Sequence, residues 1–422
     1  MPEKVSALTQ KRNNFLMMAF LAIVTPVLLF FATEIGLGRT YIRSSRSLGD
    51  CLDYEHADAG IPNISNCKTV DKLYETPLVH YSFNECGLRS VYGCQPSSSD
   101  KYTIAMLGTS VGLGQWVNDN QSLSSQIEMD TANREQKHVV VANYSRMEEA
   151  PPMMVQLLPQ ILQKKPNMVI VILTEYDVKI STANARDAAK IAKMIHASRL
   201  QWWTSYLKTL WQNETFREIV ITLNQHLLQR IEGTRLACLI ENFDFKNNAR
   251  YVHQYLAGDD GETGYLDPHP SAQWEASYSA LANEIKEMSQ LTNRSRIPLA
   301  VVLLPSHAQA IMLANPSIAS EYPSYDPYYI EHRVKGIVEA NGGDFVDIFP
   351  DCSQQNELGS HFYFENAHPD ASALSDFAKM ISKYLKDHYL PKSPNQSAQI
   401  SIPRLEISKS YPTKQNLLEM PG

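Results

Sequence analysis

The sequence has no excess of basic residues. Its 422 residues include 38 lysines and arginines against 45 acidic residues, which gives a formal net charge of −7. A protein that binds nucleic acid needs a basic surface to neutralise phosphates, so we expect no nucleic acid partner. The sequence also has no phosphate loop and no internal repeat, which argues against the commonest nucleotide site and against a solenoid.

No two of the six cysteines form a C-x-x-C pair. A zinc site is therefore not expected, and we predict neither a metal nor an organic cofactor. Four cysteines crowd into one segment, which indicates disulfides in an oxidising compartment. The local pairing is Cys51–Cys67 and Cys86–Cys94. Cys238 and Cys352 form either a third bridge or two buried thiols.

One long apolar segment lies near the N-terminus. Phe15–Thr33 is a run of 19 uncharged residues, about 28 Å long as a helix, which is enough to span a hydrocarbon core. A cleaved signal peptide is the alternative, but the run is long for one and no clear A-x-A site follows. We predict a transmembrane anchor over 15–35 and a cytoplasmic tail over 1–14. The cysteines place the main domain in the periplasm or in the extracellular or lumenal space.

The rest of the chain divides by its pattern. Residues 40–100 are rich in cysteine, proline and asparagine and predict an irregular cap stapled by disulfides. Strands and helices alternate from residue 102 onward, which predicts an α/β domain with a parallel sheet between two helical layers. The strand candidates are Thr103–Leu107, His138–Ala142, Met168–Leu173, Leu299–Leu304 and Asp344–Ile348. The helix candidates are Ser122–Ala132, Met153–Gln163, Glu275–Leu291, Pro327–Ala340 and Ser372–Tyr389.

Two segments depart from this alternation. Residues of about 180–295 form a long, mainly helical insertion that contains three tryptophans close together. It either packs on the main domain, forms a lid over a site, or rests on the bilayer as an amphipathic surface. Residues 391–422 are rich in Ser, Pro, Gln and Lys, and we predict that this tail is disordered.

The stretch from Ile104 to Trp116 organises the chain. Four apolar residues run into Gly108-Thr109-Ser110 and then into two further glycines. A strand that ends in Gly-x-Ser presents a hydroxyl at the carboxyl edge of a sheet, where open α/β proteins bind ligands. A helix that begins at the serine would aim free N–H groups at a developing oxyanion. We therefore predict that Ser110 is a nucleophile.

A serine nucleophile needs a base and a group that orients the base. The segment from Phe362 to Asp370, which follows the last strand candidate and precedes the last helix candidate, supplies both. Glu365 and His368 are three residues apart, so the carboxylate can reach one ring nitrogen while the other faces Ser110. We predict His368 as the base and Glu365 as its orienting group.

These motifs resemble those of one hydrolase family. Gly108-Thr109-Ser110-Val111-Gly112-Leu113-Gly114 looks like the G-D-S-x-x-x-G block of the GDSL/SGNH hydrolase superfamily, and Glu365-x-x-His368 looks like its closing D-x-x-H block. Asn84-Glu-Cys-Gly87-Leu-Arg89 resembles the N-x-x-G-F-R element of membrane-anchored extracytoplasmic members. Arg89 would either reach towards the site or pin the cap.

The resemblance implies a flavodoxin-like three-layer α/β/α domain over 101–390. It also implies a serine esterase or O-acyltransferase. The implied substrate is an acylated, most simply acetylated, glycan. The implied partner is a membrane-bound acyltransferase.

The likeness is incomplete on the oxyanion side. Thr109 replaces the Asp of G-D-S, and Glu365 replaces the orienting Asp. The second block, from Asn143 to Glu148 with Ser145 within it, has no glycine, and the third block has Tyr176 in place of the usual Asn. We assign Gly108, Ser145 and Tyr176 to oxyanion or substrate binding. Asp177 is expected to brace the loop.

Losing one oxyanion donor typically costs about 10²–10³ in kcat. The rival interpretation is therefore a catalytically weak subunit that binds glycan or an acyltransferase partner.

Overall fold

The structure is a computed structural model, and its described part comprises residues 22, 24–33, 48–53, 63–72, 75–90, 101–132, 138–147, 149–182, 247–257, 262–363 and 366–390. The predicted tails 1–14 and 391–422 lie outside it, as do residues 183–246 of the predicted insertion. Residues 24–33 of the predicted anchor are helical. Within the described residues, no helix has the length and apolar character needed to cross a membrane.

A five-stranded parallel sheet forms the centre of the main domain. In chain order its strands are β3 (Lys101–Gly108), β4 (His138–Asn143), β5 (Met168–Leu173), β6 (Leu299–Leu303) and β7 (Asp344–Val346). Their spatial order β4-β3-β5-β6-β7 is the 2-1-3-4-5 order of flavodoxin-like folds. All six residues of β5 are buried, as the unbroken apolar run predicts for a strand covered on both faces. The predicted α/β fold class is confirmed.

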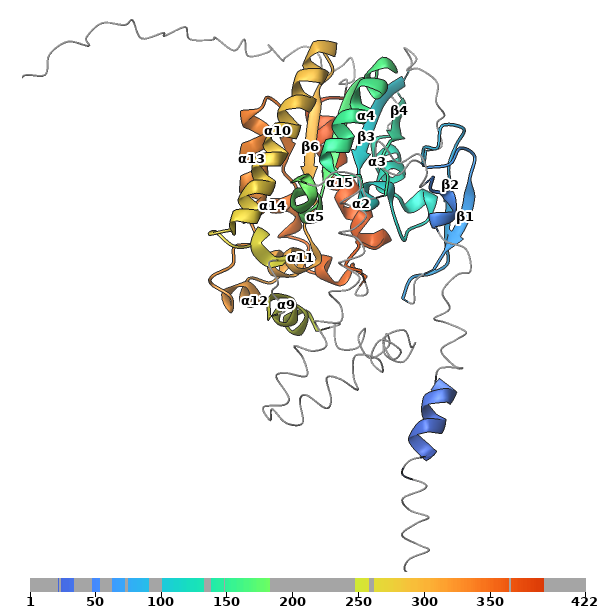
Figure 1. Cartoon of the computed structure of the whole chain (residues 1–422), viewed down its shortest axis with the longest axis vertical. Coiled ribbons are helices and arrows are strands. Elements are labelled where there is room, and N and C mark those ends of the chain that lie inside the picture. The colour runs from blue at the N-terminus through green and yellow to red at the C-terminus, as the bar shows by residue number, and fades with distance from the viewer. Residues whose placement is uncertain are drawn as a thin grey trace, which may run out of the picture.

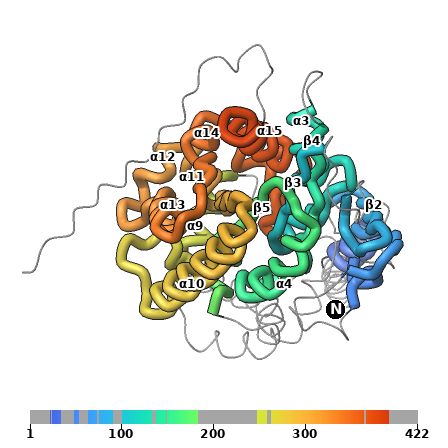
Figure 2. The backbone as a smooth tube through the Cα atoms, turned by 90° about the horizontal axis from the view of Figure 1, so that it is seen from above, coloured from blue at the N-terminus to red at the C-terminus, as the bar shows by residue number. Residues whose placement is uncertain are grey.

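Helices cover both faces of this sheet (Figures 1 and 2). On one face α3 (Leu123–Thr131) packs against α15 (Ala371–His388), and on the other α4 (Pro151–Gln163) packs against α10 (Ala272–Ser295). Next to α10 lies α13 (Tyr329–Ala340). Local sequence sets the helix starts: Ser122, Ser271 and Asp370 each accept a backbone N–H as the N-cap residue.

Short helices gather at the carboxyl edge of the sheet (Figure 1). Those labelled in Figure 1 are α2 (Ser110–Leu113), α5 (Glu175–Lys179), α9 (Asn248–Ala257), α11 (His307–Ala314), α12 (Pro316–Ser320) and α14 (Phe349–Cys352). The described chain also contains the short helices η2 (Asp119–Gln121), η3 (Ile180–Thr182), η4 (Glu262–Tyr265) and η5 (Leu358–Ser360). The last part of the predicted insertion is α10, whose buried face joins the main core. That part is a crossover helix of the domain, because its apolar residues recur at helical spacing towards the sheet.

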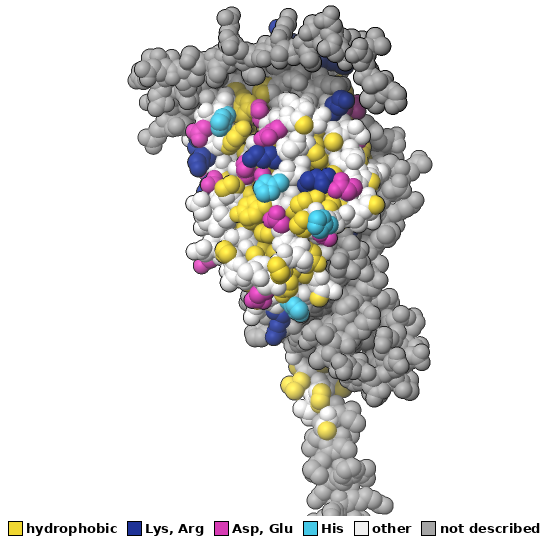
Figure 3. All heavy atoms as spheres, turned by 90° about the vertical axis from the view of Figure 1, so that its left-hand side faces the viewer, with side chains coloured by type: hydrophobic (Ala, Val, Ile, Leu, Met, Phe, Trp, Pro, Cys, Tyr) yellow, Lys and Arg dark blue, Asp and Glu magenta, His cyan; other side chains and the backbone are white. Residues whose placement is uncertain are grey.

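The surface turned to the viewer in Figure 3 carries both charge signs. Basic, acidic and histidine side chains are scattered among apolar ones, and neither sign dominates this face (Figure 3). This mixture agrees with the modest net charge of −7.

The predicted cap packs on the nucleophile helix. It contains η1 (Leu48–Cys51) and an antiparallel pair, β1 (Lys68–Asp71) and β2 (Val79–Ser82). Leu113 of α2 belongs to the same apolar cluster as Val79, Tyr81 and Phe83 of the cap. The core of the cap is therefore closed by the helix that Ser110 begins.

The cysteine predictions are tested in part. The Cys51–Cys67 disulfide is present, as predicted. Cys86 is disulfide-bonded as well, whereas its predicted partner Cys94 lies outside the described residues. Cys352 is a buried free thiol, which fits the second of the two alternatives for it. Cys238 also lies outside the described residues.

Candidate active site

The nucleophile loop, residues 108–117, begins where β3 ends. Ser110 is the first residue of α2, and Thr109 is its N-cap residue. A Cβ on Gly112 would lie 2.6 Å from the Ser145 hydroxyl oxygen, so only glycine fits there. Gly114 ends the helix in the left-handed region, at φ +82°. Because β3 and β5 flank the point at which the strand order reverses, Ser110 stands at the edge where α/β proteins bind ligands.

The predicted nucleophile and base meet. His368 Nε2 lies 2.9 Å from Ser110 Oγ across 258 residues of sequence. This is hydrogen-bond distance for a hydroxyl that transfers its proton to an imidazole. The two loops thus meet at one rim, as the sequence predicts.

A hairpin pairing of residues 361–363 with residues 366–370 holds the histidine. Phe362 and Pro369 form an antiparallel bridge, and the Tyr363 N–H donates to the His368 carbonyl at 2.9 Å. Within this hairpin Ala367 adopts φ +56°, and its N–H donates to the Tyr363 carbonyl. His368 is therefore presented by a cross-linked turn.

The other ring nitrogen faces Asn366. His368 Nδ1 lies 3.1 Å from the Asn366 carbonyl oxygen and 3.1 Å from Asn366 Oδ1. The predicted orienting residue, Glu365, lies outside the described residues. Burial lowers the pKa of His368 to about 4, and the contact with Asn366 opposes that shift. The imidazole is therefore neutral, and able to accept a proton, at ordinary pH.

Three backbone N–H groups of the second block donate hydrogen bonds to acceptors within the protein. The N–H groups of Tyr144, Ser145 and Arg146 donate to Met106 O, Asn143 Oδ1 and Gly108 O, at 2.8, 3.0 and 3.1 Å. Ser145 is fully buried against Gly112, and its oxyanion role stays a prediction. None of these three N–H groups is left for an oxyanion.

The third block braces itself. Asp177 Oδ2 accepts the Thr174 N–H at 2.7 Å and the Thr174 hydroxyl at 2.8 Å, which confirms the predicted bracing role. Burial raises the pKa of Asp177 to about 6, against hydrogen bonds from Thr109 and Thr174. Tyr176 packs beside Ala150, and its oxyanion role also stays a prediction.

A buried acid lies between these two blocks. Glu149 is fully buried, and neither of its carboxylate oxygens has a hydrogen-bond partner in the described part of the chain. Burial raises its pKa to about 8, Arg146 opposes that shift, and Asp177 adds to it. An unpaired acid of this kind is held neutral instead of charged.

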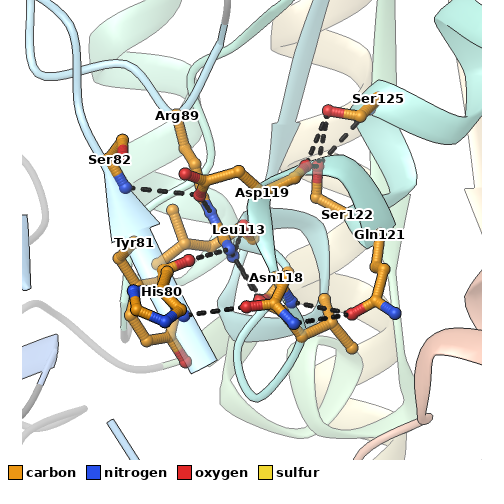
Figure 4. Close-up of polar contacts among 12 residues, drawn as sticks. His80, Tyr81, Ser82, Arg89, Leu113, Asn118, Asp119, Gln121, Ser122 and Ser125 are labelled. Carbon is orange, nitrogen blue, oxygen red and sulfur yellow. Dashed lines mark hydrogen bonds and ion pairs between the residues drawn. The ribbon is translucent and has the colours of Figure 1, made fainter. Parts of the chain in front are cut away.

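Arg89 pins the cap to the nucleophile loop (Figure 4). Its Nε donates to Asp119 Oδ1 at 2.8 Å, Nη1 donates to the carbonyls of Leu113 and Gly114, and Nη2 donates to those of His80 and Val117. All five donors of the guanidinium are thus used. The group also lies 4.4 Å above the Tyr81 ring. Of the two alternatives for Arg89, the structure shows the pinning role.

Two tyrosines join the cap, the nucleophile loop and the hairpin through one residue. The Trp116 N–H donates to the Tyr81 hydroxyl at 2.8 Å, and the Tyr363 hydroxyl donates to the Trp116 carbonyl at 3.2 Å. Trp116 itself adopts φ +67°. The role of Trp116 cannot be predicted from its residue type, because its main chain makes these contacts.

Sequence reasoning also missed Asn366 and Glu149. A signal existed for Asn366: an asparagine two residues before the histidine can form an Asx turn. Glu149 had none, since a carboxylate before a helix is usually solvated. Within the described residues, no group of three or more His, Cys, Asp or Glu side chains could hold a metal ion.

Comparisons with known proteins give structural likeness only. No family model matches the chain, and no curated protein matches it. The chain is similar to the crystal structure of TesA, at 10% identity, 68% coverage of this chain, 98% of that chain and a TM-score of 0.35. It is also similar to a lipase/acylhydrolase from Enterococcus faecalis, at 9% identity, 68% and 97% coverage and a TM-score of 0.35.

A third similar structure is the psychrotrophic esterase EstA from Pseudoalteromonas sp. The identity is 11%, the coverage is 68% of this chain and 99% of that chain, and the TM-score is 0.32. At identities and TM-scores this low, the likeness supports no inference about activity, which has to be argued from the site itself.

Proposed function

We propose that this chain is a serine-dependent carboxylic ester hydrolase or O-acyltransferase of the GDSL/SGNH type. One observation carries the proposal: the 2.9 Å contact between Ser110 Oγ and His368 Nε2. It occurs at the edge where a flavodoxin-like sheet binds ligands, on a loop with the G-x-S-x-x-x-G spacing. A surface serine and histidine that met by chance would not share that position.

The reaction would run in two balanced halves. Ser110 Oγ attacks the acyl carbonyl as its proton passes to His368 Nε2, and the C–O bond to the sugar then breaks as the imidazolium protonates the leaving alcohol. Water, or a second sugar hydroxyl, attacks the acyl-serine after giving its proton to His368. The serine oxygen recovers that proton, and acid or transferred ester leaves.

Charge on the carbonyl oxygen needs donors. The Ser110 N–H begins a helix and has no intrahelical acceptor, so it would serve as one. Gly108, Ser145 and Tyr176 are the other residues that we propose for oxyanion or substrate binding. Because the N–H groups of Tyr144, Ser145 and Arg146 already have acceptors, none of these three would serve the oxyanion, and each missing donor typically costs about 10²–10³ in kcat.

The proposed substrate is an acylated, most simply acetylated, glycan outside the cytoplasm. Three sequence features support this proposal: the apolar run over 15–33, the clustered cysteines, and the Asn84-to-Arg89 element that resembles anchored extracytoplasmic members. A membrane-bound acyltransferase is the proposed partner. The acyl group would then pass to or from the polysaccharide at the membrane surface.

A second function deserves testing because of the oxyanion side. The N–H groups of Tyr144, Ser145 and Arg146 already donate within the protein, which favours a catalytically weak subunit that binds glycan or the acyltransferase partner. In that function Ser110 and His368 would contact an ester without turning it over.

Acetate release from an acetylated polysaccharide separates the two functions. The full chain is incubated with the polysaccharide, with and without added deacetylated acceptor, and Ser110→Ala is the matched control. Release that depends on Ser110 supports the enzyme, and transfer to the acceptor assigns the acyltransferase branch. Saturable binding of the polysaccharide by folded wild type, with release no faster than that of Ser110→Ala, supports the binding subunit instead.

A further inference from the structure

We propose that Asn366, a neutral residue, positions the catalytic imidazole by fixing the proton of His368 on Nδ1. This inference rests on the proposed function, because it assigns a role within the same site. The groups that face Nδ1 in the described residues are an amide and a backbone carbonyl, whereas Glu365, the orienting group predicted from the sequence, lies outside those residues.

The orientation of the Asn366 amide is set by the main chain. The His368 N–H lies 2.9 Å from Asn366 Oδ1, and a backbone N–H can only donate. The oxygen of the amide must therefore face it, because the NH₂ group would set donor against donor. Asn366 Nδ2 points the other way, is buried, and makes no hydrogen bond in the described part of the chain.

This orientation decides the tautomer of His368. Nδ1 lies 3.1 Å from each of two acceptors, Asn366 Oδ1 and the Asn366 carbonyl oxygen. A nitrogen between two acceptors carries the proton, so the lone pair is on Nε2. Nε2 then accepts from Ser110 Oγ at 2.9 Å, which is the arrangement a general base needs.

Because the groups that face Nδ1 are neutral, they stabilise the protonated form of His368 less than a carboxylate would. A carboxylate would stabilise the imidazolium by its charge, whereas an amide and a carbonyl offer only dipoles. The acids on neighbouring elements are engaged elsewhere: Asp370 caps α15 and pairs with His361 at 3.6 Å, and Asp177 binds Thr174. The low pKa of His368, about 4, agrees with a ring that has no charged partner among the described residues.

Three variants of the full chain test the assignment. They are Asn366→Ala, which removes the amide, Asn366→Asp, which adds a charge at the same place, and Glu365→Gln, which removes the rival orienting charge. The readout is the pH dependence of the rate at which a small fluorophosphonate modifies Ser110. Uniformly ¹⁵N-histidine-labelled protein, with His368→Gln for assignment, reports which ring nitrogen is protonated.

The proposal predicts a distinct result for each variant. Asn366→Ala slows modification about 10- to 100-fold, a fraction of the 10²–10⁴ that a general base supplies. Asn366→Asp moves the acid limb up by about one pH unit or more, because a nearby opposite charge favours the imidazolium. Glu365→Gln slows modification less than Asn366→Ala does, because the proposal gives the larger share of the orienting role to Asn366.

The opposite order of effects would overturn the assignment of Asn366 as the positioning residue. A severe loss in Glu365→Gln with near-normal Asn366→Ala would make the carboxylate the orienting group. The spectra test the inference without activity: wild type must show the Nδ1–H tautomer, and an Nε2–H tautomer refutes the assignment. If no variant and no wild type reacts with the probe, the proposed function fails, while the tautomer still decides the role of Asn366.

Discussion

The two halves of the candidate site are built differently. The half that carries Ser110 and His368 is cross-linked to the cap by the five donors of Arg89 and by the backbone of Trp116. The half made of residues 143–149 and 174–177 directs its polar groups to itself and leaves Glu149 buried without a hydrogen bond in the described chain. Hydrogen bonds hold the first half in one geometry, whereas the second half is destabilised by a buried carboxyl group that has no hydrogen bond in the described chain.

The difference indicates that the second half is not optimised for stability. A site that only packed well would not keep a buried acid without a hydrogen bond, because burying that acid costs free energy. Departures of this kind collect at functional sites. Substitutions in the first half should therefore abolish activity or lower stability, whereas removing the buried acid of the second half should raise stability.

Removing the reacting groups should have the largest effect. Ser110→Ala and His368→Ala are each expected to lower ester turnover by at least about 10⁴-fold, because nucleophile and base act as a unit. The double variant should be no worse than either single one. Steady-state kinetics measure this, with Ser320→Ala, an exposed serine at the end of α12, as the control. Additive losses would show that the two residues do not work together.

The second largest effect is expected from removing the hydrogen bonds that Arg89 of the cap donates to the nucleophile loop. Arg89→Met removes the hydrogen bonds that the guanidinium donates to four carbonyls and to Asp119, so we expect a loss of about 2–4 kcal/mol in the free energy of unfolding. Turnover should fall with it, since α2 loses its brace. Denaturant unfolding and kinetics measure both effects.

The matched control for this change is Arg333→Met. Arg333 pairs with both oxygens of Glu275 on the α10/α13 face, and its loss should leave turnover unchanged. Equal losses of activity in the two variants would mean that any missing arginine harms the fold in the same way.

Relieving the second half should raise stability. The folded pKa of Glu149 is raised to about 8 from 4.5 by burial, so the folded chain holds this proton more tightly than the unfolded chain. The stability of the wild type should therefore fall as pH rises from about 4.5 to about 8. Glu149→Gln removes that dependence and should gain about 1–3 kcal/mol above pH 8, with little change near pH 4.

Unfolding free energies of Glu149→Gln and wild type at pH 5 and pH 9 measure this gain. A pH-independent difference would show that Glu149 does not change its charge. A loss of stability in the variant at pH 9 would mean that the carboxylate has a partner that compensates its burial.

The smallest effect is expected at the link between the two loops. Tyr363→Phe removes one hydrogen bond, to the Trp116 carbonyl, worth about 0.5–1.5 kcal/mol. Turnover should drop about two- to tenfold with KM unchanged, because the link holds the hairpin and not the substrate. Tyr325→Phe, at the half-buried turn after α12, serves as the control. A change in KM alone would place the Tyr363 hydroxyl on the substrate.

Periodicity predicted the fold, and position predicted the catalytic pair. Strands such as Met168–Leu173 are unbroken apolar runs, and burial on both faces is what such a run requires. Ser110 and His368 follow strands of one parallel sheet, so the topology brings them to one edge. Their contact was therefore accessible to pattern reasoning.

The supporting contacts were not accessible in this way. Trp116 acts through its main chain, and Asn366 through an amide whose orientation depends on a neighbouring N–H. Glu149 reads as a surface acid until the packing of α4 is known. Apart from the Asx-turn signal at Asn366, residue types do not predict these interactions, because they arise from backbone geometry in three dimensions.

The most direct test of the central claim is to map the covalent adduct of a fluorophosphonate probe. The folded full chain is treated with the probe, digested, and sequenced by mass spectrometry. The account predicts a single phosphonylated site at Ser110 that disappears in His368→Ala. An adduct on another residue, or none on a folded chain, would contradict it.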